Sequence, residues 1–331
     1  MKNIAVIGAG GWGLTLGLLL NEKGNHVNIW CYDEAEKNAI LQYRENKRCL
    51  PGIKIPIEIG FTTSMQEVLS GKEIVILAVP SKAIRATVNK MKDYIEDKSV
   101  IVNVSKGIEE ETLLRLSEVI EEVLSNRIVV LSGPSHAEEV ARHIPTTVVV
   151  SGRDMSATEM IQDTFMTQSF RVYTNDDLIG IELGGALKNV IALAAGAVEG
   201  MGYGDNTKAA LITRGIAEIT RLGVAMGGKP TTFAGLAGIG DLIVTCTSGH
   251  SRNRRAGELL GRGYTVDQAL EKVNMVVEGV PTTKAGHALM LKYGIEMPIL
   301  NAIHETLFEN KSVKEAINNL MGRDKKSEHY Y

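Results

Sequence analysis

The 331-residue sequence has few of the residues that mark disulfide-rich or metal-binding proteins. Its three cysteines, Cys31, Cys49 and Cys246, are an odd number and lie far apart, so they form neither a disulfide framework nor a CxxC pair. The seven histidines include no HExxH motif and no close Cys/His cluster. We therefore expect no structural metal, and we expect a protein of the reducing cytoplasm.

The sequence also lacks an excess of positive charge. Its formal net charge of −3 argues against a general nucleic-acid binder. The apolar run Ile4–Leu20 is interrupted by five glycines and ends without a cleavage pattern, so we expect folded structure there rather than a targeting segment. No later stretch is judged long and apolar enough to span a bilayer.

The first half of the chain alternates short apolar runs with segments of helical period. We expect helices over Gly11–Lys23 and Glu110–Leu124, among others. Nearly continuous apolar strands that alternate with helices are typical of an α/β fold with a mostly parallel sheet covered on both faces. The expected strands are Asn3–Gly8, His26–Trp30, Glu73–Val79, Ser99–Ser105, Arg127–Gly133 and Thr146–Gly152.

After about Asp177 the strand pattern almost disappears, and long helical patterns follow, such as Leu183–Val198 and Thr207–Met226. This shift predicts a domain of residues 1–178 that binds a dinucleotide and an all-helical substrate and catalytic domain of residues 179–331. Small-molecule enzymes commonly bind substrate between two such domains.

A glycine-rich turn, "GAGGWG" from Gly8 to Gly13, fits the GxGxxG pattern between a predicted strand and a predicted helix. Gly8 allows the tight turn, Gly10 allows the backbone to approach a pyrophosphate, and Gly13 allows close packing of helix on strand. The helix N-terminus offers N–H groups and a positive dipole end to the anion. The turn therefore predicts a Rossmann-type, doubly wound domain that binds NAD or NADP.

The choice between NAD and NADP depends on the end of the second strand. Asp33 lies slightly late for the acidic residue that would bind a ribose hydroxyl. Tyr32 either lies against the adenosine end of the cofactor or is a surface aromatic residue. The cofactor preference stays open.

One lysine, Lys188, lies in the otherwise apolar segment from Glu182 to Gly200. Its stem could cover apolar surface while its ammonium reaches water. Alternatively, the small neighbours and Asn189 indicate a close-packed site in which a lysine with a lowered pKa transfers the proton of a secondary alcohol during hydride transfer.

Other polar residues in loops could complete such a site. Lys106 follows a strand at the edge of the sheet where open α/β folds bind ligands. Asp241 lies in the glycine-rich "GLAGIGDL" and could direct a carboxylate toward a lysine. Ser135 and backbone N–H groups of "GPSHAEE", which starts at Gly133, follow another strand.

The dense basic cluster "HSRNRRAG", from His250 to Gly257, has two interpretations. It could be a solvated helix face. Ser251, Arg252 and Asn253 also lie just before an expected helix and offer donors suited to a phosphate, which favours a phosphorylated substrate.

Together these motifs resemble those of the bacterial-type NAD(P)-dependent sn-glycerol-3-phosphate dehydrogenases. "GAGGWG", "SKGIE", "GPSHAEEVA", "ELGGALKNVIALAAG", "GDNTKAALITRG", "GLAGIGDLIVTCTS", "SRNRR" and "VVEGV" occur in the same order, and the resemblance extends from Asn3 to about Ile299. It implies reversible reduction of dihydroxyacetone phosphate to glycerol 3-phosphate, a precursor of glycerophospholipids.

The resemblance also implies residue roles. Lys188 would be the proton acceptor, with Lys106 and Asp241 beside it in catalysis. Substrate contacts are implied for Lys106, Gly133, Ser135, Lys188, Asp241, Ser251, Arg252 and Asn253. Cofactor contacts are implied for Gly8, Gly10, Gly11, Trp12, Gly13, Tyr32, Lys106, Ala137, Arg252, Val276 and Glu278.

Two positions depart from the family pattern. Gly11 stands where the family usually has serine, so one hydroxyl contact to the pyrophosphate is missing. Tyr32 stands where many members have Arg or His, which removes a positive group for the 2′-phosphate of NADP.

Two other classes of protein share part of this pattern. A two-domain hydroxyacid dehydrogenase need not bind a phosphate, and "SRNRR" argues against it. A redox sensor that binds NAD(P)H without catalysis would have little use for Lys188, Lys106 and Asp241 together. Apolar helical surface makes a homodimer reasonable.

Overall fold

The computed structural model describes residues 1–328, which divide into two compact units. The first unit contains Met1–Lys106 and Leu116–Leu178, and the second contains Gly107–Arg115 and the chain from Ile179 onward. The predicted division at residue 178 did not foresee that residues 107–115 leave the first unit.

This excursion has its own local structure. Ile108 pairs with Arg115 in an antiparallel bridge, and Ile108 and Leu113 pack in the apolar core of the second unit. The guanidinium of Arg115 forms a buried ion pair with Glu182. The helix expected over Glu110–Leu124 is therefore wrong at its start, because the first part of this segment turns back on itself.

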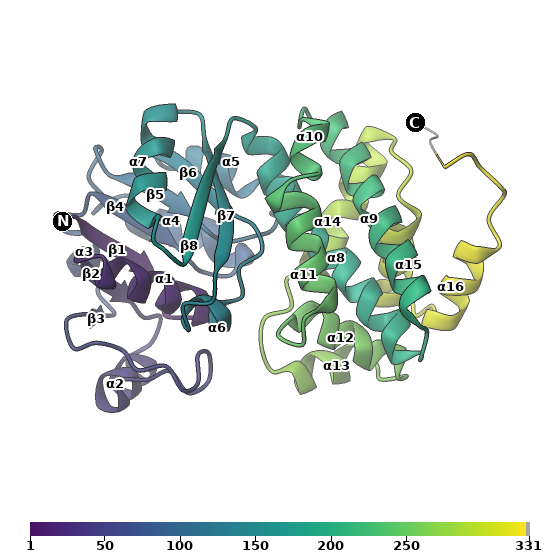
Figure 1. Ribbon diagram of the computed structural model, residues 1–331, viewed down its shortest axis with the longest axis horizontal. Coiled ribbons are helices and arrows are strands. Elements are labelled where there is room, and N and C mark those ends of the chain that lie inside the picture. Colours follow the sequence, from purple (N-terminus) through teal and green to yellow (C-terminus); the bar gives the residue numbers. More distant parts are fainter. Residues whose placement is uncertain (329–331) are drawn as a thin grey trace. The chain divides into compact units, whose positions relative to one another are not determined.

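An eight-stranded sheet lies at the centre of the first unit (Figure 1). Its strand order is β3-β2-β1-β4-β5-β6-β7-β8, and every neighbouring pair is parallel except β6 and β7. The expected doubly wound, mostly parallel α/β fold is confirmed. The strands are β1 (Asn3–Ile7), β2 (His26–Trp30), β3 (Gly60–Thr62), β4 (Ile74–Leu77), β5 (Val100–Asn103), β6 (Arg127–Ser132), β7 (Thr146–Gly152) and β8 (Phe170–Asn175).

Two strands were not predicted, and both lie at the edges of the sheet. The strand β3 has three residues, too few to show a periodic pattern. The strand β8 begins with alternating buried and exposed residues, unlike the continuous apolar runs of the central strands. A half-exposed edge strand gives a weaker sequence signal than a buried parallel strand.

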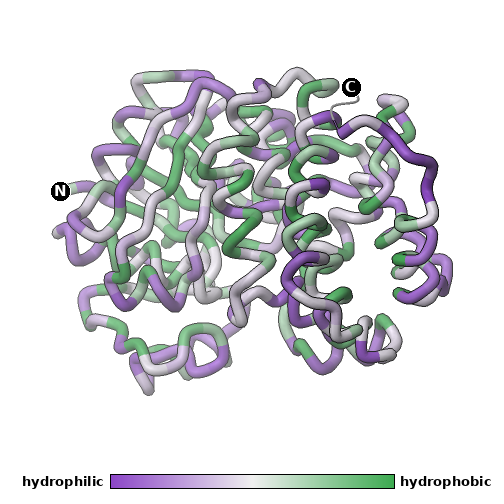
Figure 2. The backbone as a smooth tube through the Cα atoms, turned by 45° about the vertical axis from the view of Figure 1, so that its right-hand side comes forward, coloured by the Kyte–Doolittle hydropathy of each residue, from purple (hydrophilic) through white to green (hydrophobic). Residues whose placement is uncertain are grey.

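Helices cover both faces of this sheet, as Figure 1 shows. The helix α1 contacts α6 and α7 in one layer, and α4 contacts α3 and α5 in the other. Figure 2 shows the apolar strands enclosed by more polar turns and helices. The helices are α1 (Gly11–Glu22), α2 (Glu34–Tyr43), α3 (Met65–Leu69), α4 (Ile84–Met91), α5 (Leu116–Glu121), α6 (Ala137–Val140) and α7 (Met155–Phe165).

The second unit is helical in its described residues from Ile179 onward, as the sequence predicts. Its central helix α8 (Leu178–Gly200) is buried along most of its length and contributes many residues of the core. The others are α9 (Asp205–Ala225), α10 (Pro230–Phe233), the π-turn η2 (Leu236–Gly240), α11 (Asp241–Thr247), α12 (Arg252–Gly261), α13 (Val266–Val273), α14 (Gly279–Tyr293), α15 (Pro298–Phe308) and α16 (Val313–Met321).

The helix α8 is long and apolar enough to cross a membrane by length and composition, so the expectation that no later stretch qualifies was wrong. However, 94% of its apolar window is buried inside the protein, as in a core helix.

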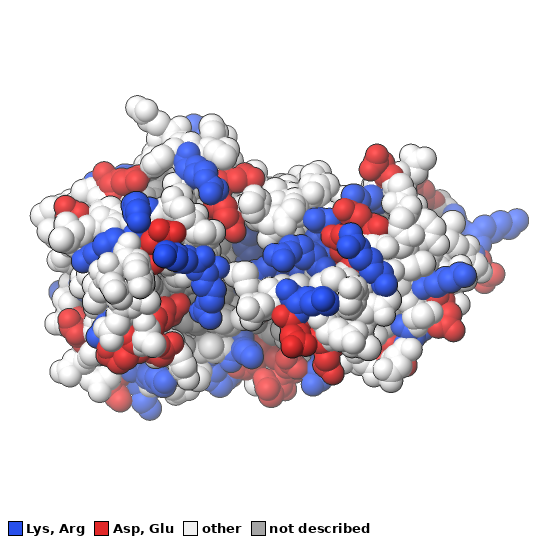
Figure 3. Space-filling model, turned by 90° about the horizontal axis from the view of Figure 1, so that it is seen from below, with Lys and Arg blue, Asp and Glu red and all other residues white. Residues whose placement is uncertain are grey.

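One face of the surface is mixed in charge: on the face shown in Figure 3, Lys and Arg are interspersed with Asp and Glu.

Candidate active site

The glycine-rich turn of the first unit has the geometry of a phosphate cradle. Gly8 has φ +120°, and a Cβ atom there would lie 2.6 Å from the carbonyl oxygen of Ala78. A Cβ atom at Gly13 would overlap the backbone of Gly8, whereas one at Gly10 would meet nothing within 4 Å. The backbone is therefore open at the position where a pyrophosphate must approach, and the turn fits a dinucleotide.

The helix that follows is also suited to an anion. The helix α1 begins at Gly11, and its N-cap residue Gly10 provides no side-chain cap. The first N–H groups of a helix have no carbonyl partner within it, and they carry the positive end of the dipole. An anion at this end of α1 would accept hydrogen bonds from them.

Glycine at position 11 has a structural reason. A Cβ atom there would lie 2.6 Å from the carbonyl oxygen of Cys49 and 3.7 Å from the Cβ atom of Ala137. The hydroxyl of Thr15 donates to the carbonyl of Ala137 at 3.2 Å. The structure thus places Ala137 beside the start of α1. Trp12 is partly buried and packs against the apolar core of this unit.

Asp33, the acidic residue that follows the end of β2, has a structural role as the N-cap residue of α2. The carboxylate of Asp33 caps α2 by accepting the N–H of Glu36 at 2.8 Å. Tyr32 is 77% exposed, its ring lies edge-on to Trp30, and the ammonium of Lys90 lies 5.9 Å from its centroid. Contact of Tyr32 with the adenosine end stays a prediction.

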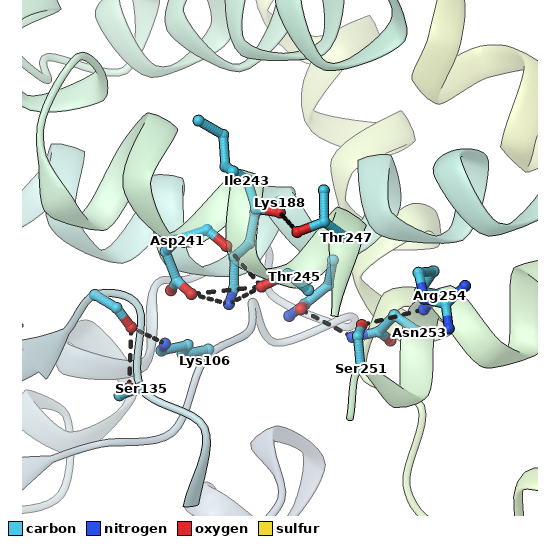
Figure 4. A network of polar contacts seen from close by, with 12 residues as sticks. Lys106, Ser135, Lys188, Asp241, Ile243, Thr245, Thr247, Ser251, Asn253 and Arg254 are labelled. Carbon is cyan, nitrogen blue, oxygen red and sulfur yellow. Dashed lines mark hydrogen bonds and ion pairs between the residues drawn. The ribbon is translucent and has the colours of Figure 1, made fainter. Parts of the chain in front are cut away.

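Three other predicted residues of the first unit lie together at the carboxyl ends of β5 and β6 (Figure 4). The ammonium of Lys106 donates to the carbonyl of Gly133 at 3.0 Å, and the hydroxyl of Ser135 donates to the same carbonyl at 2.9 Å. Gly133 has φ +125°, a backbone conformation that favours glycine.

In the second unit, Lys188 is buried with only 6% of its surface exposed. Its ammonium donates to the carboxylate of Asp241 in an ion pair and to the hydroxyl of Thr245 at 2.8 Å (Figure 4). The hydroxyl of Thr245 in turn donates to the carbonyl of Asp241 at 2.6 Å. The interpretation of Lys188 as a surface-reaching lysine is therefore wrong, because its charged end is compensated inside the protein.

The glycine-rich turn before α11 allows this contact. A Cβ atom at Gly184 of α8 would lie 2.7 Å from the carbonyl oxygen of Ala237, so helix and turn approach backbone to backbone. Gly238 has φ −95° and ψ −105° and lies against the backbone of Phe233. The turn thereby brings Asp241, the first residue of α11, to the side of α8 that carries Lys188.

Thr245 was missed in the sequence. The available signal was its position four residues after Asp241, which places both side chains on one face of a helix. The next residue, Cys246, is buried, and burial raises the pKa of its thiol to about 12. This thiol is therefore a packing group rather than a nucleophile.

The cluster "SRNRR" begins α12. Ser251 is the N-cap residue, and its hydroxyl oxygen accepts the N–H of Arg254 at 3.2 Å. Asn253 is buried: it donates to the side-chain oxygen of Asn189 at 2.9 Å and accepts the N–H of Gly279 at 2.8 Å. Arg252 is exposed. The interpretation as a solvated face holds for Arg252 and not for Asn253 or Arg254.

The remaining predicted cofactor contacts lie just before α14. Val276 is 38% exposed, and Glu278 is the N-cap residue of that helix. The bond from Gly279 to Asn253 joins this segment to the start of α12. Within residues 1–328, no group of three or more His, Cys, Asp or Glu side chains is arranged to hold a metal ion.

Comparisons with known proteins identify the family. Residues 3–158 match the family model described as NAD-dependent glycerol-3-phosphate dehydrogenase N-terminus, and residues 177–318 match its C-terminus. A glycerol-3-phosphate dehydrogenase [NAD(P)+] of Fusobacterium nucleatum is 55% identical and one of Bacillus subtilis 53% identical, each over 99% of this chain; the match covers 99% and 96% of those proteins.

A solved structure gives the same result. The crystal structure of glycerol-3-phosphate dehydrogenase from Coxiella burnetii is 37% identical, with a TM-score of 0.94 over 97% of this chain and 99% of that one. The chain therefore belongs to the NAD(P)-dependent glycerol-3-phosphate dehydrogenases, oxidoreductases that act on a CH–OH group.

Proposed function

We propose that Lys188 is the general acid that protonates the carbonyl oxygen of dihydroxyacetone phosphate during reduction, and the general base in the reverse direction. The observation that carries this proposal is the buried ammonium held by Asp241 and Thr245. A buried cation costs several kcal/mol unless it is paired. The pair fixes the direction of the ammonium before substrate binds, which lowers the cost of orientation in the transition state.

The cofactor is NAD or NADP, and the residues of the glycine-rich turn are proposed to hold its pyrophosphate. Gly10 gives the backbone its open approach, and α1 directs its first N–H groups there. When bound, the nicotinamide supplies the hydride that reduces the carbonyl carbon. Tyr32, Ala137, Val276 and Glu278 are proposed as further cofactor contacts.

The substrate phosphate is proposed to bind at the start of α12, where Ser251, Arg252 and Asn253 lie. A helix N-terminus and an exposed guanidinium both favour a dianion. Because the side chain of Asn253 is used in bonds to Asn189 and Gly279, we assign its contribution to the backbone. Contacts from Lys106, Gly133 and Ser135 of the first unit are proposed as well.

These assignments give each unit a role. We propose that residues 1–178, apart from the excursion at 107–115, bind the dinucleotide, and that the helical unit binds substrate and carries catalysis. Glycerol 3-phosphate would serve glycerophospholipid synthesis. Location in the cytoplasm is supported by three free cysteines, and a homodimer by exposed apolar side chains such as Leu291.

The test is turnover of dihydroxyacetone phosphate, followed by the absorbance of the reduced cofactor. Lys188→Met should lower turnover roughly 10²–10⁴-fold, the range for a lost general acid, while cofactor still binds. Lys292→Met, which changes an exposed lysine of the same unit, is the matched control. Near-normal turnover in Lys188→Met would overturn the catalytic role.

The same assay separates the other classes. A hydroxyacid dehydrogenase without a phosphate site would act on unphosphorylated ketones such as dihydroxyacetone as readily as on the phosphate. A redox sensor would oxidise no cofactor with either compound. Preference for the phosphorylated ketone therefore supports the proposed substrate.

A further inference from the structure

We propose that Arg254 is a positioning residue: with Glu199 it holds the loop that leads into the first turn of α12 at a fixed place relative to Lys188, and so sets the affinity for the substrate phosphate. This inference rests on the proposed function of that turn as the phosphate site. Arg254 itself need not contact the substrate.

The side chain of Arg254 is 11% exposed and joins two elements. Its Nε donates to the carbonyl of Ser248 at 2.9 Å, in the loop that precedes α12. Its Nη1 donates to a carboxylate oxygen of Glu199 at 2.7 Å, near the end of α8. Its backbone N–H is capped by Ser251. One residue thus ties the loop, the cap and α8 together.

Glu199 is held on its other side. Its second carboxylate oxygen accepts the ammonium of Lys208, in α9, at 3.1 Å. Burial alone would raise the pKa of Glu199, but the bonds from Lys208 and Arg254 outweigh burial and lower the pKa below its ordinary value. The carboxylate is therefore charged at neutral pH and keeps Arg254 in place.

Glu199 and Lys188 belong to the same helix, α8, so a group held by Glu199 is held at a fixed distance from Lys188. Glu199 lies eleven residues after Lys188, about three turns along α8 and on nearly the same side of it. The two helices α8 and α12 run in parallel, because matched positions advance together along both. The matched pairs are Asn189 with Asn253, Leu193 with Gly257, and Ala197 with Gly261.

Glycines bring these two helices to backbone distance. A Cβ atom at Gly196 would lie 2.7 Å from the amide nitrogen of Glu258, and one at Gly261 would lie 3.0 Å from the carbonyl carbon of Ala197. The helix α12 therefore cannot slide along α8 without collision. Its first turn is held level with Asn189, the neighbour of Lys188. The loop before it is joined to this packed helix by Arg254, whose Nε binds the carbonyl of Ser248; the same carbonyl also accepts the backbone N–H of Ser251 at 3.3 Å.

Lysine cannot replace this arginine. The guanidinium directs Nε and Nη1 to two different acceptors in a fixed planar geometry, whereas an ammonium is a single point donor. We expect Arg254→Lys to keep the charge and lose one of the two anchors. Glu199→Gln should weaken the same link from the other end.

The experiment measures kcat and KM with dihydroxyacetone phosphate, turnover of unphosphorylated dihydroxyacetone, and binding of sn-glycerol 3-phosphate by calorimetry. We expect Arg254→Lys and Glu199→Gln each to raise KM and weaken binding about 10-fold, with kcat and dihydroxyacetone turnover within about twofold of the unmodified enzyme. KM and binding in the double variant should be no worse than in Arg254→Lys, because both substitutions break the same link between Arg254 and Glu199. Arg255→Lys, at the exposed next position, is the matched control.

Three results would overturn the inference: an unchanged KM in Arg254→Lys, additive effects in the double variant, or equal losses with both ketones. Equal losses would indicate general damage to the fold, which thermal unfolding would show independently. If the unmodified enzyme does not reduce dihydroxyacetone phosphate, the proposed function fails, whereas binding of glycerol 3-phosphate still decides the role of Arg254.

Discussion

Replacing Gly257 by alanine adds one methyl group at the contact between α8 and α12. The new Cβ atom would lie 2.8 Å from the carbonyl carbon of Leu193 and 3.0 Å from the amide nitrogen of Ala197. Ordinary carbon–carbon contacts are about 3.5–4.0 Å. Both neighbours are backbone atoms of a buried helix that cannot rotate away, so α12 must move from α8 by about 1 Å.

Two effects follow from this displacement. Overpacking of a core contact costs about 1–3 kcal/mol of unfolding free energy. A shift of about 1 Å in substrate-positioning groups can cost about 10²-fold in rate. We therefore expect kcat/KM for dihydroxyacetone phosphate to fall about 10²-fold in Gly257→Ala, while the protein remains folded at room temperature.

The assay pairs kinetics with urea unfolding, so that lost activity is compared with the folded fraction. Gly204→Ala is the control, because a Cβ atom at Gly204 would meet nothing within 4 Å. Unchanged kcat/KM in Gly257→Ala would refute the argument that backbone contact between α8 and α12 sets the geometry of the site. So would an equal loss in Gly204→Ala.

Two further predictions concern parts of the molecule outside this contact. Burial raises the pKa of Glu218 to about 7 although its carboxylate accepts the N–H groups of Ile299 and Leu300, so the folded protein favours the protonated form. The free energy of unfolding gained from this shift is complete below the ordinary glutamate pKa and is lost as the pH rises through about 7. Glu218→Gln should therefore flatten the pH dependence of Tm between about pH 5 and 8. An unchanged slope would contradict this. Gly11→Ser should lower Tm and raise KM for NADH, because its Cβ atom would lie 2.6 Å from the carbonyl oxygen of Cys49; unaltered Tm and KM would show that the segment around Cys49 yields freely.

The parallel core of the sheet was predictable because each central strand is a continuous apolar run. The strand β7 has the predicted bounds Thr146–Gly152, and β2 has the predicted bounds His26–Trp30. The excursion of residues 107–115 was not predictable from period alone. Leu113 falls within the helix expected over Glu110–Leu124, but it packs beside Ile108 in the core of the second unit, and only long-range contacts decide between these alternatives.

For the site, the residue types could be predicted from the sequence, but the contacts between helices could not. Lys188 and Asp241 are 53 residues apart in the chain, and their pairing depends on how the turn before α11 meets α8. The one signal for Thr245 was its position four residues after Asp241, and Glu199 carried no pattern that singles it out. Arg254 was part of a visible motif, but its direction, away from solvent and toward α8, is a property of packing.

The glycines of α8 and its lysine are two parts of one arrangement. A helix with ordinary side chains would hold the turn before α11 and the helix α12 at the usual distance of 8–10 Å between axes. Gly184 and Gly196 remove side chains at these two contacts, so backbone meets backbone on both. Asp241 and Thr245 can then reach Lys188, and the first turn of α12 lies level with its neighbour Asn189. The buried ammonium of Lys188 is tolerated because its partners lie this close. The partners can lie this close because α8 has glycine, and no side chain, at these two contacts.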